Sequence, residues 1–272
     1  MKMKTRSMSG DHAASSQAAT AFPGASDKQV DSGLHGLLWD PVTAMPGDAR
    51  RQWRERAISV AVTAFDGTTA DFWLSQWSDA ELDRLSVLHV AVDDLGSPAG
   101  WVSGRRESWG NRRVFYAASA GVAPHIQGGG LSAALWRRVV MREIRRAFPR
   151  PLFVIMRTGN PMVYDAWTGA AGGPEAVHPR PGIPVPPDVQ AVAKDAAQYL
   201  GQVADIDLAT LRINDAYRDV PGGLWSNRPS SRDERTNAWF DSTLQPTDAF
   251  VVVAKFSLLG VARRSLAPRR RS

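Results

Sequence analysis

The chain has 272 residues, of which 43% are hydrophobic and 22% are charged, and this composition is typical of a soluble globular protein with one large or two small domains. It contains no cysteine, which excludes disulfides, thiol nucleophiles and thiolate metal ligands. No apolar run approaches the roughly twenty residues of a membrane span, and the first residues lack the continuous apolar core of a secretory signal, so we expect a cytoplasmic protein.

The N-terminal part of the chain changes from a polar segment to two helical patterns. Residues 1–30 are rich in Ala, Ser, Gly and Gln, and we expect them to be disordered because they cannot bury enough apolar surface to offset the entropy of ordering. Residues 48–65 carry apolar side chains at near-helical spacing behind a potential Asp48 cap, which predicts an amphipathic helix. The sequence SDAELDRL then places Ser78 and Glu81 at the spacing of a capping box, which predicts a second helix.

Three β-like runs follow, at residues 86–94, 98–108 and 112–122. They are separated by LGS and WGN, and such short turn-forming connections favour an antiparallel meander. A helical pattern at 128–148 and an apolar run at 151–157 come next. The third β-like run, this helix and the apolar run therefore predict a β-α-β unit whose two strands are parallel.

The rest of the chain predicts an insertion, a final strand and a basic tail. Proline and glycine are frequent after Gly172, which predicts an extended insertion at about 172–245 with one helical pattern inside it. The apolar run DAFVVVAKFSLLG is expected to return to the same sheet. We therefore predict one domain over residues 31–260, of the α/β (α+β) class, with a mixed, mostly antiparallel sheet flanked by helices around a central β-α-β unit. The arginine-rich tail at 261–272 supplies most of the formal net charge of +6 and is typical of a solvated chain end.

Three consecutive glycines, Gly128, Gly129 and Gly130, lie between the third strand and the helix that follows it. A dinucleotide-binding fold uses G-x-G-x-x-G followed by an acidic residue, and a Walker loop needs a lysine after its last glycine; neither pattern is present. The remaining interpretation is a pyrophosphate held by successive backbone amides at the helix start, where absent Cβ atoms let the anion approach. Residues Gln127 through Ser132 suit this role.

The sequence V-A-P-H-I-Q-G-G-G-L-S, at residues 122–132, resembles the acetyl-CoA-binding signature V-x-P-x-x-Q/R-x-x-G-x-G/A of the GNAT superfamily of acyl-CoA N-acyltransferases. Gln127 and Gly130 are in register with the signature, and Ser132 stands where Gly or Ala is usual. Val122 and Pro124 match the flanking positions. The resemblance implies acetyl-CoA as the co-substrate. The cofactor-binding residues that it implies are Val122, Gln127, Gly128, Gly129, Gly130, Leu131, Ser132 and Asn160.

A second stretch, RTGNPMVYDAW, is similar to the part of the GNAT fold in which an Asn, and then a helix bearing a Tyr, follow the second parallel strand. Here these residues are Asn160 and Tyr164, and the resemblance implies that Tyr164 protonates the departing CoA thiolate. In the commonest family spacing this Tyr lies about two turns beyond the Asn, and Trp167 takes that place here. The alternative for Tyr164 is a packed tyrosine whose hydroxyl is satisfied locally. The resemblance covers about residues 48–170 and the final strand.

The resemblance also implies a mechanism. The two parallel strands should splay near Val122 and leave backbone amides that hydrogen-bond the thioester carbonyl and stabilise the developing oxyanion. An amine then attacks directly, and a general base or a water relay removes its proton. Glu107 is the candidate base and His125 is the alternative. In the competing interpretation, Glu107 is a surface charge at a hairpin end and His125 lines the loop beside Pro124.

Together with the resemblance, the sequence predicts an acetyl-CoA-dependent N-acyltransferase that transfers an acyl group, acetyl by resemblance, to a primary amine of a small molecule or peptide. Two alternatives stay open: a non-catalytic acyl-CoA-binding module, and a nucleic-acid-binding protein that uses the basic tail. The five histidines lack metal-ligand spacing, so we expect no metal site, and we expect no membrane partner. The oligomeric state is left open between a monomer and a homodimer.

Overall fold

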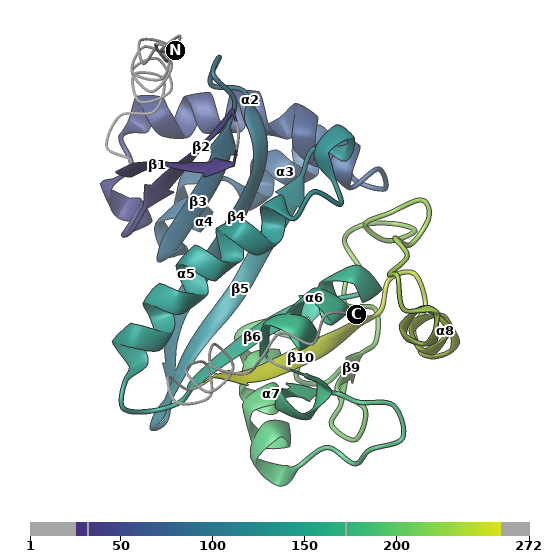
Figure 1. Ribbon diagram of the computed structural model, residues 1–272. Coiled ribbons are helices and arrows are strands. Elements are labelled where there is room, and N and C mark those ends of the chain that lie inside the picture. Colours follow the sequence, from purple (N-terminus) through teal and green to yellow (C-terminus); the bar gives the residue numbers. More distant parts are fainter. Residues whose placement is uncertain (1–25, 32, 172, 257–272) are drawn as a thin grey trace, which may run out of the picture. The chain divides into compact units, whose positions relative to one another are not determined.

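The computed structural model describes residues 26–31, 33–171 and 173–256, in which strands and helices follow one another as Figure 1 shows. The strands are β1 (Ser26–Asp31), β2 (Leu34–Trp39), β3 (Val87–Val92), β4 (Pro98–Trp109), β5 (Arg112–Val122), β6 (Leu152–Thr158), β7 (Val177–His178), β8 (Ile206–Asp207), β9 (Arg212–Ile213) and β10 (Ala249–Phe256). The α-helices are α2 (Gly47–Ala64), α3 (Ala70–Gln76), α4 (Asp79–Arg84), α5 (Leu131–Ala147), α6 (Pro161–Ala171), α7 (Pro187–Tyr199) and α8 (Glu234–Thr243). Short 3-10 helices lie at η1 (Val42–Ala44), η2 (Pro124–Ile126) and η3 (Pro174–Ala176).

The strands are joined by hydrogen bonds in the order β1-β2-β3-β4-β5-β6-β10-β9-β8, and β7 pairs with β10. β5 and β6 are parallel, whereas the pairs β1–β2, β2–β3, β6–β10, β7–β10, β9–β10 and β8–β9 are antiparallel. The helix α5 connects the two parallel strands, as a β-α-β unit requires. The predicted class, an α/β fold with a mixed, mostly antiparallel sheet flanked by helices, is therefore confirmed.

The described residues group into two compact units, and the single domain over residues 31–260 stays a prediction. Unit 1 takes its described residues from Met1–Ala64, Ala70–Ser103 and Ser119–Trp136, and unit 2 takes its own from Phe65–Thr69, Gly104–Ala118 and Arg137–Ser272. The elements β4, β5 and α5 each contribute residues to both units. All described residues after the β-α-β unit, including those of the predicted insertion, therefore belong to unit 2.

Tryptophans form the centre of unit 1. The side chains of Trp53, Trp73, Trp77 and Trp101 are buried, and their ring centroids lie 5.0–5.9 Å apart in tilted and edge-to-face pairs. These arrangements suit the quadrupole of aromatic rings. β5 passes this cluster at Gly121, where a Cβ atom would lie 2.2 Å from the Trp101 ring. The glycine is therefore required by close packing at this strand position.

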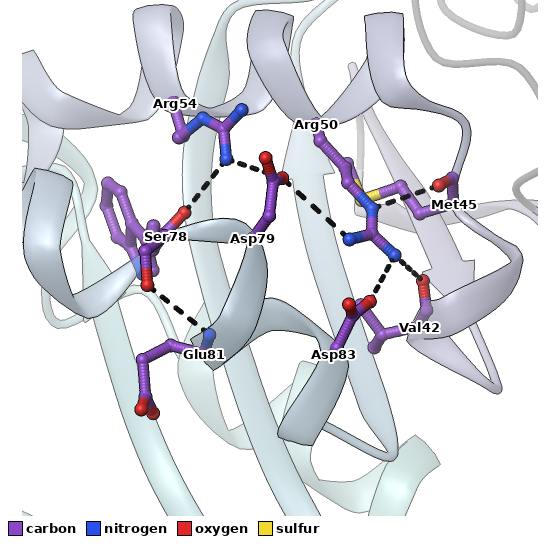
Figure 2. Close-up of polar contacts among 9 residues, drawn as sticks. Val42, Met45, Arg50, Arg54, Ser78, Asp79, Glu81 and Asp83 are labelled. Atoms are coloured by element: carbon purple, nitrogen blue, oxygen red, sulfur yellow. Dashed lines mark hydrogen bonds and ion pairs between the residues drawn. The ribbon is translucent and has the colours of Figure 1, made fainter.

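Ion pairs join α2 to α4 in unit 1 (Figure 2). Arg54 Nη1 donates to Asp79 at 2.8 Å, and Arg50 Nη2 lies 2.8 Å from Asp83. The hydrogen bond from Arg54 holds the pKa of Asp79 below its usual value. Ser78 caps α4 as predicted, because its side chain accepts a backbone N–H of the first turn. A helix of six residues is too short to be stable alone, so these contacts hold α4 in place.

The predicted insertion at about 172–245 contains the helix that the sequence indicated, α7, and also α8 and the short strands β7, β8 and β9. Its apolar side chains cover one face of the sheet in unit 2. The buried core on this face consists of Val114, Tyr116, Phe153, Ile155, Val185, Val189, Val192, Ala193, Ala196, Ala197, Leu211, Ile213, Ala216, Ala249, Val251 and Val253. Nine of these sixteen residues come from the insertion, so the insertion supplies more than half of this buried core.

Two boundaries predicted from the sequence are wrong. Segment 1–30 was expected to be disordered, but β1 overlaps its end and pairs antiparallel with β2. An edge strand is held by backbone hydrogen bonds, which a polar composition does not reveal. The helix expected at 128–148 begins at Leu131, because the glycines before it do not adopt a helical backbone. Residues 1–25 and the basic tail at 261–272 lie outside the described residues.

Candidate functional site

The predicted anion-binding residues form one continuous loop in unit 1. β5 ends at Val122, the 3-10 helix η2 (Pro124–Ile126) follows, and α5 begins at Leu131. Between them, Gly128 and Gly130 have φ angles of 82° and 84°. Glycine adopts this left-handed backbone without the steric penalty of a Cβ atom. Two of the three glycines are thus required by the turn that leads into the helix.

Backbone donors gather at the start of α5. In the part of the chain that the structure describes, the amides of Gly130, Leu131, Ser132 and Ala133 have no hydrogen-bond partner, and the amide of Ala134 is the first to donate back, to the Gly130 carbonyl at 3.0 Å. A Cβ atom built on Gly130 would meet no atom within 4 Å, so the space over the loop is open. Four adjacent donors at the positive end of a 17-residue helix form a surface that suits an anion.

The Gln127 side chain closes the loop on itself. Its Nε2 donates to the carbonyl of Val122 at 3.0 Å, and its backbone N–H donates to the carbonyl of Pro124 at 3.2 Å. The first bond links the end of β5 to the residue that precedes the glycines, so Gln127 acts on the shape of the loop. His125, the alternative base, is exposed on η2.

In unit 2, β5 and β6 pair only over their first residues. The parallel register runs from Arg113 opposite Leu152 to Tyr116 opposite Ile155. Beyond this point β6 keeps its antiparallel partner β10 through its last residue. The two strands were predicted to splay near Val122, and the structure opens them earlier, directly after Tyr116. Beyond Ile155, the side of β6 that faces away from β10 has no partner among the described strands, and one group there, the Arg157 carbonyl, accepts the Tyr217 hydroxyl at 3.3 Å.

The second predicted stretch lies at the start of α6. Asn160 caps this helix, because its Oδ1 accepts the N–H of Met162 at 2.9 Å. Tyr164 is 5% exposed, and its hydroxyl donates to the carbonyl of Pro179 at 2.8 Å. Its ring lies 5.2 Å from the ring of Trp239 in an edge-to-face arrangement. Burial raises the pKa of Tyr164, so the hydroxyl keeps its proton near neutral pH.

These contacts bear on the predicted general acid. A tyrosine hydroxyl has one proton to donate, and in this structure that proton points to the Pro179 carbonyl. The geometry is that of the second alternative for Tyr164, a packed tyrosine satisfied locally. Trp167, at the later position of the family spacing, is also buried and packs against Phe256. The catalytic role of Tyr164 stays a prediction, and it requires the bond to Pro179 to break.

Glu107 lies on β4 within a polar and aromatic cluster of unit 2. Arg105 Nη1 donates to the Tyr199 hydroxyl at 3.0 Å, and the Tyr199 ring lies 5.8 Å from that of Trp109. Burial raises the pKa of Tyr199; the Glu107 carboxylate adds to this rise and Arg105 opposes it. Tyr199 is the last residue of α7, so the insertion places a phenol hydroxyl close to Glu107, the predicted base. Sequence reasoning missed this partner because no motif relates β4 to the insertion.

The predicted site residues are divided between the units: the loop from Val122 to Ser132 belongs to unit 1, whereas Glu107, Asn160 and Tyr164 belong to unit 2. None of them lines a cavity of about 370 Å³ that β6, β10, η3, β7 and the start of α7 form in unit 2. Among the described residues, no group of three or more His, Asp or Glu side chains could hold a metal ion. Within the same ranges, no helix has both the length and the apolar character needed to cross a membrane.

Neither a family model nor a curated protein matches the chain by sequence. Solved structures that it matches include N-acetyltransferases. The ribosomal-protein-S18-alanine N-acetyltransferase from Escherichia coli is 10% identical, with 87% of this chain and 99% of that chain covered and a TM-score of 0.42. An aminoglycoside acetyltransferase from an uncultured soil metagenomic sample, in complex with sisomicin, is 10% identical, with 58% and 99% covered and a TM-score of 0.38. A GNAT family N-acetyltransferase from Escherichia coli in complex with CoA is 20% identical, with 51% and 70% covered and a TM-score of 0.35. Because these TM-scores are all below 0.5, the likenesses carry no argument, and the function of this chain rests on its own residues.

Proposed function

We propose that this protein is an acyl-CoA-dependent N-acyltransferase, which transfers an acyl group, acetyl in the first instance, to a primary amine. The observation that carries the proposal is the loop from Val122 to Ser132. It combines the residues of the GNAT acyl-CoA signature with four adjacent backbone donors at the start of a long helix. The acceptor is proposed to be the amine of a small molecule or a peptide, and a cytoplasmic location fits such an enzyme.

The loop suits the pyrophosphate of acyl-CoA in charge and in shape. Its donors are backbone amides at the positive end of the helix dipole, which favours an anion. The open space over Gly130 lets phosphate oxygens approach the backbone closely. The bond from Gln127 to Val122 keeps the loop in this shape before a ligand arrives, which reduces the entropy lost on binding. We therefore assign most of the holding to backbone from Gly128 to Ser132, and a shaping role to Gln127.

Acyl-CoA supplies an activated thioester carbonyl. In unit 2, the strand edges beyond the last pair between β5 and β6 offer backbone donors, which stabilise negative charge on a carbonyl oxygen. An attacking amine must lose a proton, and Glu107, close to the Tyr199 hydroxyl, is the proposed base, with His125 as the alternative. Tyr164 serves as the acid for the leaving thiolate only if its hydroxyl gives up the hydrogen bond to the Pro179 carbonyl and donates to the sulfur instead.

Isothermal titration calorimetry with acetyl-CoA tests the binding half of the proposal. We expect a saturable heat at sub-millimolar ligand, and no heat would contradict every acyl-CoA function, including that of a non-catalytic binding module. Release of the free CoA thiol with a broad panel of primary amines then tests the chemistry. Turnover above the rate of thioester hydrolysis supports the enzyme, whereas binding without turnover with any amine supports the module.

A further inference from the structure

At the end of β6, the insertion holds one arginine in a fixed position. Arg157 Nη1 donates to Gln202 Oε1 at 2.7 Å, and its guanidinium carbon lies 4.8 Å from the centre of the Tyr217 ring. Gln202 is 6% exposed, and its Nε2 donates to the Ala216 carbonyl at 2.9 Å, which turns the amide oxygen toward Arg157. The Tyr217 hydroxyl donates to the backbone carbonyl of Arg157 at 3.3 Å. The guanidinium is therefore preorganised by side chains far away in the sequence.

The side chains that hold Arg157 are neutral. Gln202 presents an amide oxygen and Tyr217 an aromatic face, and burial raises the pKa of Tyr217, so its phenol stays uncharged near neutral pH. Among the described residues, no carboxylate forms an ion pair with Arg157. A partly buried guanidinium usually has an anionic partner, because its desolvation is otherwise uncompensated. With Nη1 occupied by Gln202, the edge formed by Nε and Nη2 remains for such an anion.

The position of Arg157 on β6 relates it to the opening between the strands. It lies two residues beyond Ile155, the last residue of β6 that pairs with β5. Side chains alternate along a strand, so Arg157 shares the face of Phe153 and Ile155, which the insertion covers. Two strand residues span about 7 Å. The guanidinium thus borders the place where the parallel strands separate.

We propose that Arg157 binds the carboxylate of the acceptor, so that the acceptor is an amino acid or a closely related compound with a primary amine and a carboxylate. This inference rests on the proposed function, because it takes from it that the amine reacts near the opening between β5 and β6. The planar edge of a guanidinium matches both oxygens of a carboxylate, which fixes the direction of the bound molecule as well as its position. An amine on the same small molecule is then held near the strand opening, which lowers the entropy lost in reaching the thioester.

Matched pairs of amines that differ only at the carboxylate test this inference. Amino acids with primary amines and the corresponding carboxamides are offered as acceptors at saturating acetyl-CoA, with O-phosphoethanolamine as an amine that carries a phosphate. Release of the CoA thiol gives kcat/KM for each. At least one amino acid should exceed its carboxamide by about tenfold or more, as expected for a hydrogen bond between charged groups.

Three variants locate the preference. Arg157→Gln should remove it, while acetyl-CoA affinity measured by calorimetry stays at the parent value. Gln202→Glu supplies a carboxylate to Arg157 from within the chain and should also weaken the preference; it keeps the test decisive if Arg157→Gln does not fold. Arg218→Gln is the matched control, because Arg218 is an exposed arginine of the insertion that already pairs with Asp205. This control should keep the preference.

A binding measurement separates failure of this inference from failure of the proposed function. Saturation-transfer NMR with the same amine pairs, without acetyl-CoA, should show binding of the preferred amino acid and weaker binding of its carboxamide. No difference within any pair, binding of neither member of any pair, a preference that survives Arg157→Gln, or a stronger preference for O-phosphoethanolamine would each overturn the assignment of Arg157. Absence of acetyl-CoA binding would instead contradict the proposed function, and the NMR comparison would still decide the role of Arg157.

Discussion

Tyr164→Phe removes one oxygen from a buried side chain and keeps the ring that packs against Trp239 and Phe240. No cavity of consequence is created, so the change in the free energy of unfolding comes from the lost bond to the buried Pro179 carbonyl. A neutral hydrogen bond contributes about 0.5–1.5 kcal/mol, and a buried carbonyl left without a donor costs about 1–3 kcal/mol. We therefore expect the free energy of unfolding to fall by about 1–3 kcal/mol.

The same variant reports on catalysis. If the hydroxyl serves the Pro179 bond, acetyl transfer to an accepted amine should stay close to the parent rate. If Tyr164 instead protonates the departing thiolate, the chemical step should slow by roughly 10²–10⁴-fold. The structure favours the first outcome, because the hydroxyl proton is already committed to a backbone carbonyl.

Urea unfolding followed by circular dichroism gives the stability, and CoA release at saturating acetyl-CoA gives the rate, with chemistry shown to be limiting. Tyr199→Phe is a suitable control, because that hydroxyl accepts a bond from Arg105 and its ring is only partly buried, so its loss should destabilise less. A large loss of turnover in Tyr164→Phe with unchanged stability would refute the structural role. Reduced stability with near-parent turnover would remove Tyr164 from the catalytic residues.

Three further predictions concern stability. Gly121→Ala should lower the urea midpoint of unfolding, because its Cβ atom would lie 2.2 Å from a buried tryptophan ring. Overpacking of this kind typically costs about 1–3 kcal/mol. An unchanged midpoint would contradict the packing described for β5. Glu143→Gln should lower the free energy of unfolding by about 2–3 kcal/mol. The buried Glu143 carboxylate accepts two bonds of 2.8 Å from Arg106 and one of 2.8 Å from Arg146. Both arginines are partly exposed, so the loss should be smaller than the roughly 3–5 kcal/mol typical of a fully buried pair. Burial lowers the pKa of His178 from its usual 6.5, so the folded state favours the neutral ring. The contribution of His178 to the free energy of unfolding should be full above pH 6.5 and should decline as the pH falls through the lowered pKa. Unfolding measured from pH 7 to pH 4 should show a smaller decline of stability in His178→Phe than in the parent.

Elements whose signals are local could be predicted from the sequence. The runs expected at 86–94, 98–108 and 112–122 correspond closely to β3, β4 and β5, because apolar residues and short turn sequences mark both their extent and their ends. The Ser78 cap and the parallel β5–β6 pair follow from the same kind of signal. The loop before α5 was also within reach, because a signature of adjacent residues defines it.

Elements that depend on distant partners could not be predicted. β1 is a polar strand that exists through backbone bonds to β2, and the two-residue strands of the insertion are too short to show a period. The same reason applies to the site: Gln202 reaches Arg157 across 45 residues, and Tyr164 bonds to a carbonyl 15 residues further on. No spacing rule relates these pairs, so the sequence left Tyr164 open between a general acid and a packed tyrosine, and it gave no sign of a fixed arginine.

Acetyl-CoA binding by a variant at Gly130 tests the central claim most directly. Gly130→Ala places a methyl group on the open side of the loop, at a φ of 84° that costs roughly 1–2 kcal/mol for a residue with a Cβ atom. Gly33→Ala lies outside the loop, at a φ of 77° and in equally open surroundings, and controls for this strain in unit 1. We predict that the Kd measured by calorimetry rises about tenfold or more in folded Gly130→Ala and stays near the parent value in Gly33→Ala. An unchanged Kd in folded Gly130→Ala would contradict the assignment of this loop to acyl-CoA, and with it the proposed function.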